Sequence, residues 1–351
     1  MAGSADSAGV RGLDTAAVGA WLDRNLDAVG PFDFSLIAAG GSNLTYRVLD
    51  AEGTAFALRR PPEGTTLATA HDVGREWTIM SALAAADAVP VPGCRVRCDD
   101  ETVTGAPFYV MDFVDGTILR TVADTSSLTV ADGERATDAL VGGQVAFHTL
   151  DLAAVGLADL GRHDGYVARQ LRRWKTQIER ADARPVPVVH ELHDALAARI
   201  PEERVRPALA HGDYRFDNVV LAADLSLAAV LDWELCTTGD PIADFAWSTQ
   251  YWADPGDDLT WLLDPPTTAD AFPRRADVIV RYQAATGFDL SDYPFYEAFS
   301  WWKQGCIVEG VHARRLQGSQ GGMRQTGPAS EIATRADMLL DRAHTLVHAL
   351  D

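Results

Sequence analysis

The chain has 351 residues, of which 47% are hydrophobic and 23% charged, an ordinary composition for a globular protein of two domains. Its net charge of −20 argues against a nucleic-acid partner, because binding to a phosphate backbone needs clustered Lys and Arg. The N-terminus lacks the apolar core of a secretory signal, and no apolar run reaches the ~20 residues that span a bilayer. We therefore expect a cytoplasmic protein without membrane contact, whose four cysteines are reduced.

The first 112 residues predict an N-terminal lobe that contains a small antiparallel sheet. After a leader that ends near Ser7, one helix is expected, followed by short β-rich runs broken by Gly-containing turns. A second helix interrupts the strands and ends before Val89-Pro-Val-Pro, because proline cannot continue a helix. The expected helices are Thr15–Leu26 and His71–Ala86, and the five expected strands are Phe34–Ile37, Leu44–Leu49, Thr54–Leu58, Arg95–Cys98 and Pro107–Met111.

Residues 113–351 predict a second, mostly helical lobe. A sheet that is followed by helices indicates an α+β chain with two lobes. Two short strands are expected among the helices, at Val219–Leu221 and Ala228–Leu231. The expected helices are Leu128–Leu150, Asp164–Ala181, Val186–Ile200, Pro273–Ala285, Tyr296–Gln317 and Ile332–Leu350.

The segment His211-Gly-Asp-Tyr-Arg-Phe-Asp-Asn218, together with Asp232 at the end of the next strand, has the groups that phosphoryl transfer requires. Transfer to an alcohol needs a carboxylate that orients the hydroxyl and oxygen ligands that hold Mg²⁺ against the phosphates. Asp213 is the expected base, and Asn218 and Asp232 are the expected metal ligands. Arg215 could neutralise charge on the transferred group. The alternative is that the carboxylates of this segment belong to an ordinary turn.

Several further segments occur in an order and at a spacing that are specific together. They are Gly40-Gly-Ser-Asn-Leu-Thr-Tyr46, Leu58-Arg-Arg-Pro-Pro62, Ala70-His-Asp-Val-Gly-Arg-Glu76, Gly105-Ala-Pro-Phe-Tyr-Val-Met111 and Gly239-Asp-Pro-Ile-Ala-Asp244. With these segments the chain resembles the aminoglycoside phosphotransferase family, a relative of the protein kinases. In particular, it resembles the subgroup found fused to, or encoded beside, acyl-CoA dehydrogenases. The resemblance covers nearly the whole chain and implies a bilobal, protein-kinase-like fold.

The resemblance also implies an ATP site, and its residues can be compared with the family pattern. Arg59 stands where the family places a cation over the ATP phosphates, although the neighbouring Arg60 could take that place. Val73, Glu76, Met80 and Leu83 share one helix face, so Glu76 is a carboxylate on an apolar face and needs a partner such as Arg59. If Glu76 lies instead at the rim of this face, in water, it needs no partner.

Two more segments are expected to contact the nucleotide. The turn Gly40-Gly-Ser-Asn could place backbone amides over the phosphates, with Ser42 and Asn43 among its residues, but it is equally a hairpin signal and is shorter than in the subgroup. The segment Met111-Asp112-Phe113 resembles the link between the lobes of kinases, where backbone groups of Asp112 and Phe113 would bind the adenine edge. His211 is interpreted as a buried structural histidine, as in kinase-like folds.

One helix face predicts a surface for the phosphate acceptor. Tyr166, Gln170, Arg173 and Trp174 lie at i, i+4, i+7 and i+8, where a core helix would have Leu or Val. They could form a substrate wall with an aromatic surface and a cation, or simply a solvated face with an amphipathic Trp.

The sequence therefore predicts an ATP- and Mg²⁺-dependent transfer of a phosphoryl group to the hydroxyl of a small molecule. Relatives in the subgroup indicate a hydroxy acid or a hydroxyacyl-CoA, and an aminoglycoside is less favoured because the substrate lobe has no dense acidic run. A nucleotide-binding pseudokinase is the main alternative, since Arg replaces the usual Lys. A metal-dependent hydrolase that uses His211 and Asp213 is a weaker one.

Overall fold

The computed structural model describes residues 10–39, 43–62, 72–162, 164–254, 257, 264–318 and 328–350. The chain divides into two compact units. The described residues up to Ala84 and the segment Val91–Val114 belong to the first unit, and Ala85–Pro90 joins the residues from Asp115 onward in the second. No helix in the described part of the chain is both long and apolar enough to cross a membrane.

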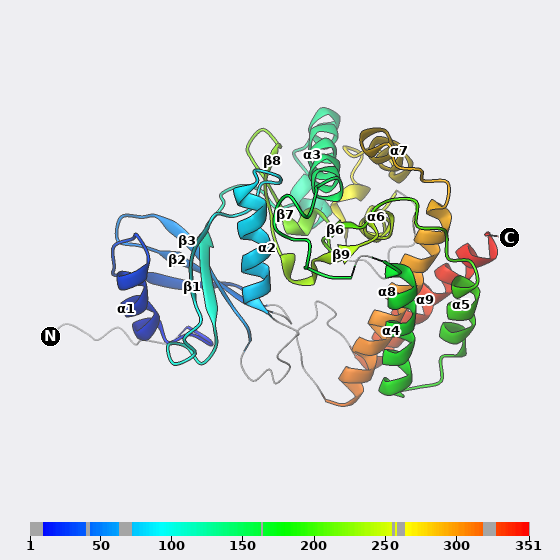
Figure 1. Cartoon of the computed structure of the whole chain (residues 1–351), viewed down its shortest axis with the longest axis horizontal. Helices are drawn as coiled ribbons and strands as arrows, with labels where there is room; N and C mark the ends of the chain where they lie inside the picture. Colours follow the sequence, from blue (N-terminus) through cyan, green and yellow to red (C-terminus); the bar gives the residue numbers. More distant parts are fainter. Residues whose placement is uncertain are drawn as a thin grey trace. The chain divides into compact units, whose positions relative to one another are not determined.

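The first unit is built on a five-stranded antiparallel sheet (Figure 1), as the sequence predicts. Its order is β1-β2-β3-β5-β4, so the fifth strand is inserted between the third and the fourth. The strands are β1 (Asp33–Ala39), β2 (Leu44–Leu49), β3 (Ala55–Arg60), β4 (Cys94–Cys98) and β5 (Phe108–Asp112).

A helix packs on each face of this sheet, because side chains along a strand alternate between its faces. Leu58 and Val110 face one side, where they form a core with Leu22 of helix α1 (Thr15–Asn25). Arg59 and Tyr109, one position along, face helix α2 (Val73–Ala85) on the other side. The start expected for this second helix, His71, lies outside the described residues.

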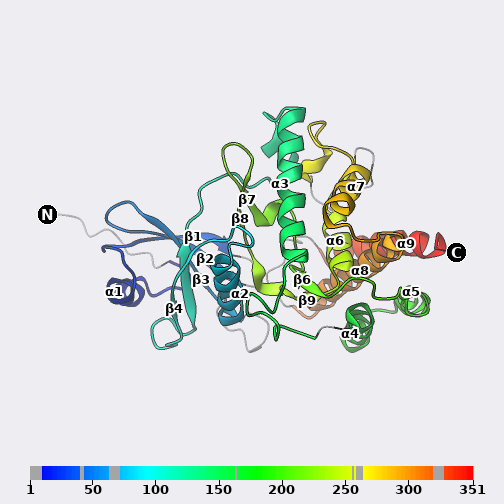
Figure 2. The ribbon, with the colours of Figure 1, turned by 45° about the horizontal axis from the view of Figure 1, so that its top comes forward.

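The second unit consists mainly of helices around two small sheets (Figure 2). Strand β6 (Ala208–Ala210) pairs with β9 (Thr237–Gly239), and β7 (Val219–Leu221) pairs with β8 (Leu227–Val230). The sequence predicts the β7–β8 pair but misses β6 and β9, each of which has only three residues. The helices are α3 (Val130–His148), α4 (Tyr166–Ala181), α5 (Pro187–Ala197), α6 (Pro241–Thr249), α7 (Arg275–Thr286), α8 (Tyr293–Leu316) and α9 (Ala329–His348).

Candidate functional site

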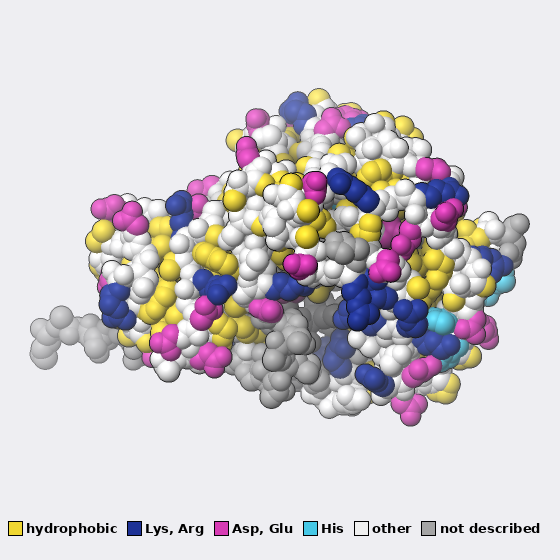
Figure 3. Space-filling model, in the orientation of Figure 1, with side chains coloured by type: hydrophobic (Ala, Val, Ile, Leu, Met, Phe, Trp, Pro, Cys, Tyr) yellow, Lys and Arg dark blue, Asp and Glu magenta, His cyan; other side chains and the backbone are white. Residues whose placement is uncertain are grey.

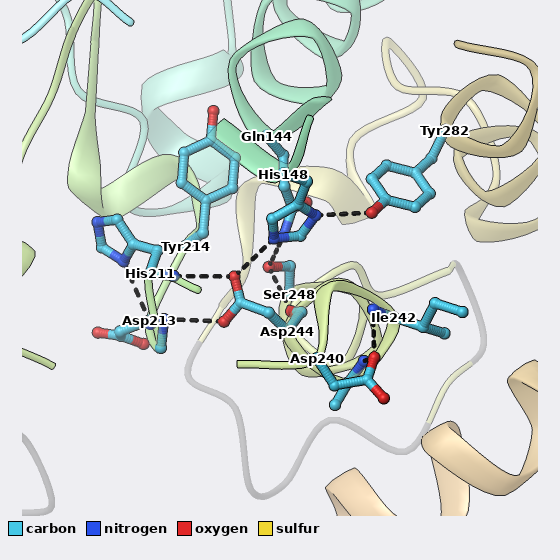
Figure 4. Close-up of polar contacts among 12 residues, drawn as sticks. Gln144, His148, His211, Asp213, Tyr214, Asp240, Ile242, Asp244, Ser248 and Tyr282 are labelled. Carbon is cyan, nitrogen blue, oxygen red and sulfur yellow. Dashed lines mark hydrogen bonds and ion pairs between the residues drawn. The ribbon is translucent and has the colours of Figure 1, made fainter. Parts of the chain in front are cut away.

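The segment between β6 and β7 is held in place by a buried carboxylate from α6 (Figure 4). Asp244 accepts hydrogen bonds from the backbone N–H groups of His211, at 3.0 Å, and Gly212, at 2.8 Å. The Nε2 of His148 in α3 lies 3.1 Å from the same carboxylate, and its Nδ1 lies 2.6 Å from the hydroxyl of Tyr282. Burial raises the pKa of Asp244, but the bonds from His148 and Gly212 outweigh it and hold the pKa below its usual value.

The imidazole of His211 is structural, which confirms the interpretation made from the sequence. It is fully buried, and its Nε2 lies 2.9 Å from the carbonyl oxygen of Leu231, which can only accept a hydrogen bond. Its Nδ1 accepts from the backbone N–H of Asp213 at 3.3 Å. These partners require the neutral Nε2–H tautomer. Both nitrogens are therefore occupied, and this argues against a hydrolase in which His211 binds a metal.

Asp213 lies in a polar cluster within the same loop. The side-chain amide of Asn218 donates to the backbone carbonyl of Asp213 at 2.7 Å and to its Oδ2 at 3.1 Å. The Nε of Arg215 lies 3.4 Å from Oδ1, and its guanidinium also stacks 4.5 Å from the ring centre of Tyr251. Burial raises the pKa of Asp213, Arg215 opposes this, and Asp232 raises the pKa further. The carboxylate is thus a stronger base than an exposed Asp.

Asp232 is brought to this loop by the β7–β8 hairpin. The backbone N–H of Leu231 donates to the carbonyl of Asn218 at 2.8 Å, which fixes the end of β8 beside the end of the loop. Asp232 itself has φ 64° and ψ 59°, a left-handed conformation that Asp tolerates better than most residues. The charge of Asp232 raises the pKa of Asp213. The predicted metal ligand and the predicted base therefore lie within electrostatic range of each other.

These residues fit a divalent cation of the magnesium type. The amide N–H group of Asn218 donates to Asp213, so the Oδ1 of Asn218 points to the other side of the planar amide. An amide oxygen and the Asp232 carboxylate are hard ligands, which Mg²⁺ prefers, and Mg²⁺ usually needs only one or two of them from the protein.

In the first unit, the predicted pair of Arg59 and Glu76 is present. The Nε of Arg59 lies 2.9 Å from Oε2 of Glu76, and the two side chains are 11% and 1% exposed. Arg60 points elsewhere and donates to the backbone carbonyls of Gly12 and Pro61. The structure therefore selects Arg59 over Arg60 as the partner of Glu76, while a role in nucleotide binding stays a prediction.

The segment around Met111 has fewer backbone groups available to a nucleotide than the sequence indicates. The backbone N–H of Asp112 donates to Gly93 at 2.9 Å, and that of Phe113 donates to Ala55 at 3.3 Å. Both donors are thus occupied within the sheet, so an adenine ring could use only the carbonyl oxygens of these two residues. Met111 is buried in β5.

The turn before β2 is only partly described. Asn43 is buried directly before the strand, whereas Ser42 and the two preceding glycines lie outside the described residues. Their predicted contacts with phosphates stay predictions.

The predicted acceptor face of α4 divides into two parts. Tyr166 is buried against Gly239 of β9, and Trp174 is half-buried with its Nε1 donating to Gln170 at 3.1 Å. Arg173 instead lines an open cavity with other arginines, which the sequence reasoning did not select. Tyr166 is thus buried against β9, whereas Arg173 is exposed at the cavity.

Lys303 in α8 is a candidate that the sequence reasoning missed. Its ammonium lies 4.0 Å from the ring centre of Trp247. Burial lowers its pKa to about 8, with Arg173 acting in the same direction and Asp244 and Asp213 against it. These interactions place Lys303 electrostatically between α4 and the catalytic loop. The sequence does not distinguish it, because α8 also carries other polar and charged side chains such as Gln304 and Glu309.

The profile of the phosphotransferase enzyme family matches residues 33–299. The chain belongs to this family. Acyl-CoA dehydrogenase family member 11 of Gallus gallus is 35% identical to this chain, over 80% of this chain and 37% of that protein. Acyl-CoA dehydrogenase family member 10 of Mus musculus is 33% identical over 87% of this chain and 29% of that protein. The chain thus spans less than half the length of these relatives.

A solved structure of a Ralstonia eutropha protein, assigned as an aminoglycoside phosphotransferase, superposes with a TM-score of 0.79. It is 28% identical, over 96% of this chain and 98% of that one. The predicted resemblance and the kinase-like α+β fold are both confirmed.

Proposed function

We propose that the chain transfers the γ-phosphoryl group of ATP, with Mg²⁺, to a hydroxyl group of a small molecule. The observation that carries the proposal is the cluster in which Asp213, Arg215 and Asn218 are held together beside Asp232. Membership of the phosphotransferase family supports the reaction type.

Asp213 would orient the acceptor hydroxyl and take its proton. About a quarter of its side chain is exposed, so an acceptor can reach it, and burial of the remainder raises its pKa and thereby its basicity. Arg215 lies close enough to counter the negative charge that builds up on the transferred group.

Asn218 and Asp232 would hold the metal. Magnesium supplies charge neutralisation of the nucleotide phosphates when it is bound. Arg59 would add a cation for the phosphates, since its forked guanidinium binds phosphate well.

The ion pair of Arg59 and Glu76 also bears on the pseudokinase alternative. Arg59 and Glu76 have the charges and the contact of the Lys–Glu pair that active kinases need. Replacement of Lys by Arg at this position is therefore no argument for an inactive protein.

An anionic acceptor, a hydroxy acid or a hydroxyacyl-CoA, fits the second unit better than a polycationic aminoglycoside. Lys303 lies within electrostatic range of Asp213, Asp244 and Arg173, and the two cations would repel a polycation. Relatives named as acyl-CoA dehydrogenase family members support a coenzyme A thioester.

The test compares two variants of the cluster with a matched control. Asp213→Asn should lower acceptor-dependent ADP release by about 10²–10⁴-fold, as expected for loss of a general base, with little change in MgATP affinity. Asp232→Asn should impair both turnover and Mg²⁺-dependent nucleotide binding. Asp224→Asn changes an exposed carboxylate that bonds to Ser226 in the β7–β8 turn, and both quantities should stay as in the wild type.

A screen of hydroxylated metabolites for ADP release supplies the acceptor. If Asp213→Asn keeps near-normal, acceptor-dependent ADP release, Asp213 is not the base. Tight MgATP binding by the wild type without turnover on any acceptor would favour the pseudokinase.

A further inference from the structure

Five arginines surround one open cavity on helix α4, with a volume of about 430 Å³. Thr176 and Gln177 complete its lining, and no acidic residue takes part in it. Figure 3 shows Lys and Arg side chains gathered on this part of the second unit. The arginines are Arg162, Arg169, Arg172, Arg173 and Arg180.

The helix itself creates this concentration of charge. Arg169, Arg172, Arg173 and Arg180 lie at i, i+3, i+4 and i+11, so they share one face of α4. Arg162 precedes the helix and is joined to it, since the guanidinium of Arg169 donates to its backbone carbonyl at 3.0 Å.

These arginines lack carboxylate partners among the described residues. Elsewhere in the second unit, arginines pair with acids: Arg184 bonds to Glu309 and Asp337, and Arg281 bonds to Glu134 and Asp138. Like charges at such spacings on a helix repel one another. In a chain of net charge −20, an unpaired cationic cluster is a strong local exception, and a bound anion would relieve the repulsion.

The cavity is electrostatically connected to the catalytic loop. Arg173 lowers the pKa of Lys303, and Asp213 raises it. Arg169 and Arg173 also lower the pKa of Tyr166, whereas Asp240 and Asp244 at the N-terminus of α6 raise it. Two arginines that line the cavity therefore lie within electrostatic range of groups near the catalytic loop.

We propose that the five-arginine cavity on α4 binds a ligand group that carries two or more phosphates. Guanidinium groups bind phosphate through paired hydrogen bonds, and several of them can hold a multiply charged group. The volume lies in the range of small-molecule sites. The phosphates could belong to the acceptor, as the nucleotide end of a coenzyme A thioester does, or to a separate polyphosphate. The first assignment rests on the proposed function, whereas the binding site does not.

Binding is tested directly on the full chain with adenosine 3′,5′-bisphosphate as the probe. Saturation with Mg²⁺ and a non-hydrolysable ATP analogue removes the nucleotide site from the measurement. Arg172→Gln/Arg180→Gln should raise the Kd of the probe by at least about tenfold, since each charged hydrogen bond contributes roughly one power of ten. Arg120→Gln, which changes an exposed arginine outside the cavity, should leave the Kd unchanged. Absence of binding to the wild type, or an unchanged Kd in the double variant, overturns the site.

Kinetics separate the two sources of the phosphates. If they belong to the acceptor, the double variant should raise the KM of a hydroxyacyl-CoA about tenfold or more, and should not change the KM of the matching hydroxyacyl-pantetheine, which lacks these phosphates. The KM of ATP should stay constant. Loss of probe binding with an unchanged KM for the CoA thioester shows that the ligand is a separate polyphosphate and overturns the acceptor assignment. A wild type without any turnover refutes the proposed function, but the binding measurement still decides the site.

Discussion

Replacement of Arg59 by methionine would leave the carboxylate of Glu76 inside the first unit without its ionic partner. The Arg59 and Glu76 side chains are 11% and 1% exposed, and their charged atoms are 2.9 Å apart. Removal of one partner from such a pair costs about 3–5 kcal/mol of folding stability, because the remaining charge stays buried. The expected loss on nucleotide binding is about 10–100-fold, that of one charge-assisted hydrogen bond to phosphate. A measurement of ATP affinity alone would confuse these two effects.

The double variant Arg59→Met/Glu76→Met separates them. With both charges replaced by apolar side chains of similar length, most of the lost stability should return. If Arg59 contacts the phosphates, this stable variant should still bind MgATP about 10–100-fold more weakly than the wild type. Arg60→Met is the matched control: it removes a guanidinium that bonds to backbone carbonyls, at a cost of about 1–3 kcal/mol, and should not affect MgATP binding.

Denaturant unfolding and calorimetric titration with MgATP supply the two readouts. A loss of stability in Arg59→Met no larger than that in Arg60→Met would refute the buried-pair reasoning. A double variant with wild-type affinity for MgATP would refute the nucleotide role of Arg59, whatever its stability.

Two further predictions concern the second unit. Asp244→Asn should lower the free energy of unfolding by about 1–3 kcal/mol for each buried donor left unsatisfied. Because the folded-state pKa of Asp244 is lowered, its stabilising contribution is present above its unfolded value of 3.8 and is lost as the pH falls below it. Urea unfolding of wild type and variant at pH 7 and pH 3 should show a smaller difference in the free energy of unfolding at pH 3, and a difference that grows on acidification would contradict this. Lys303→Met should raise stability most below pH 8, and the gain should shrink between its folded pKa of about 8 and its unfolded value of 10.5, where only the unfolded chain is protonated. A gain that does not change between pH 7 and pH 9.5 would argue against a buried ammonium.

The sequence by itself determined what depends on short spacings. Alternation along β3 and the helical period of α2 predicted that Glu76 needs a partner on the sheet, and the Arg59 contact is present. The spacing of Asp213 and Asn218 within one loop likewise brought their side chains together. These relations are local because a loop of a few residues, or one helix face, leaves little freedom for the side chains concerned.

Only the tertiary structure decided which distant residues complete the part of the candidate site that lies in the second unit. Asp244 fixes the loop from 33 positions further along, and His148 reaches the same carboxylate from α3. Lys303 is one of several charged residues in α8, and its surroundings are decided only when α8 packs beside α4 and α6. Neither periodicity nor spacing can show such contacts, because they depend on how separate helices pack. The same applies to the arginines on α4: the sequence gives their spacing, but only the folded structure shows that no described carboxylate lies opposite them.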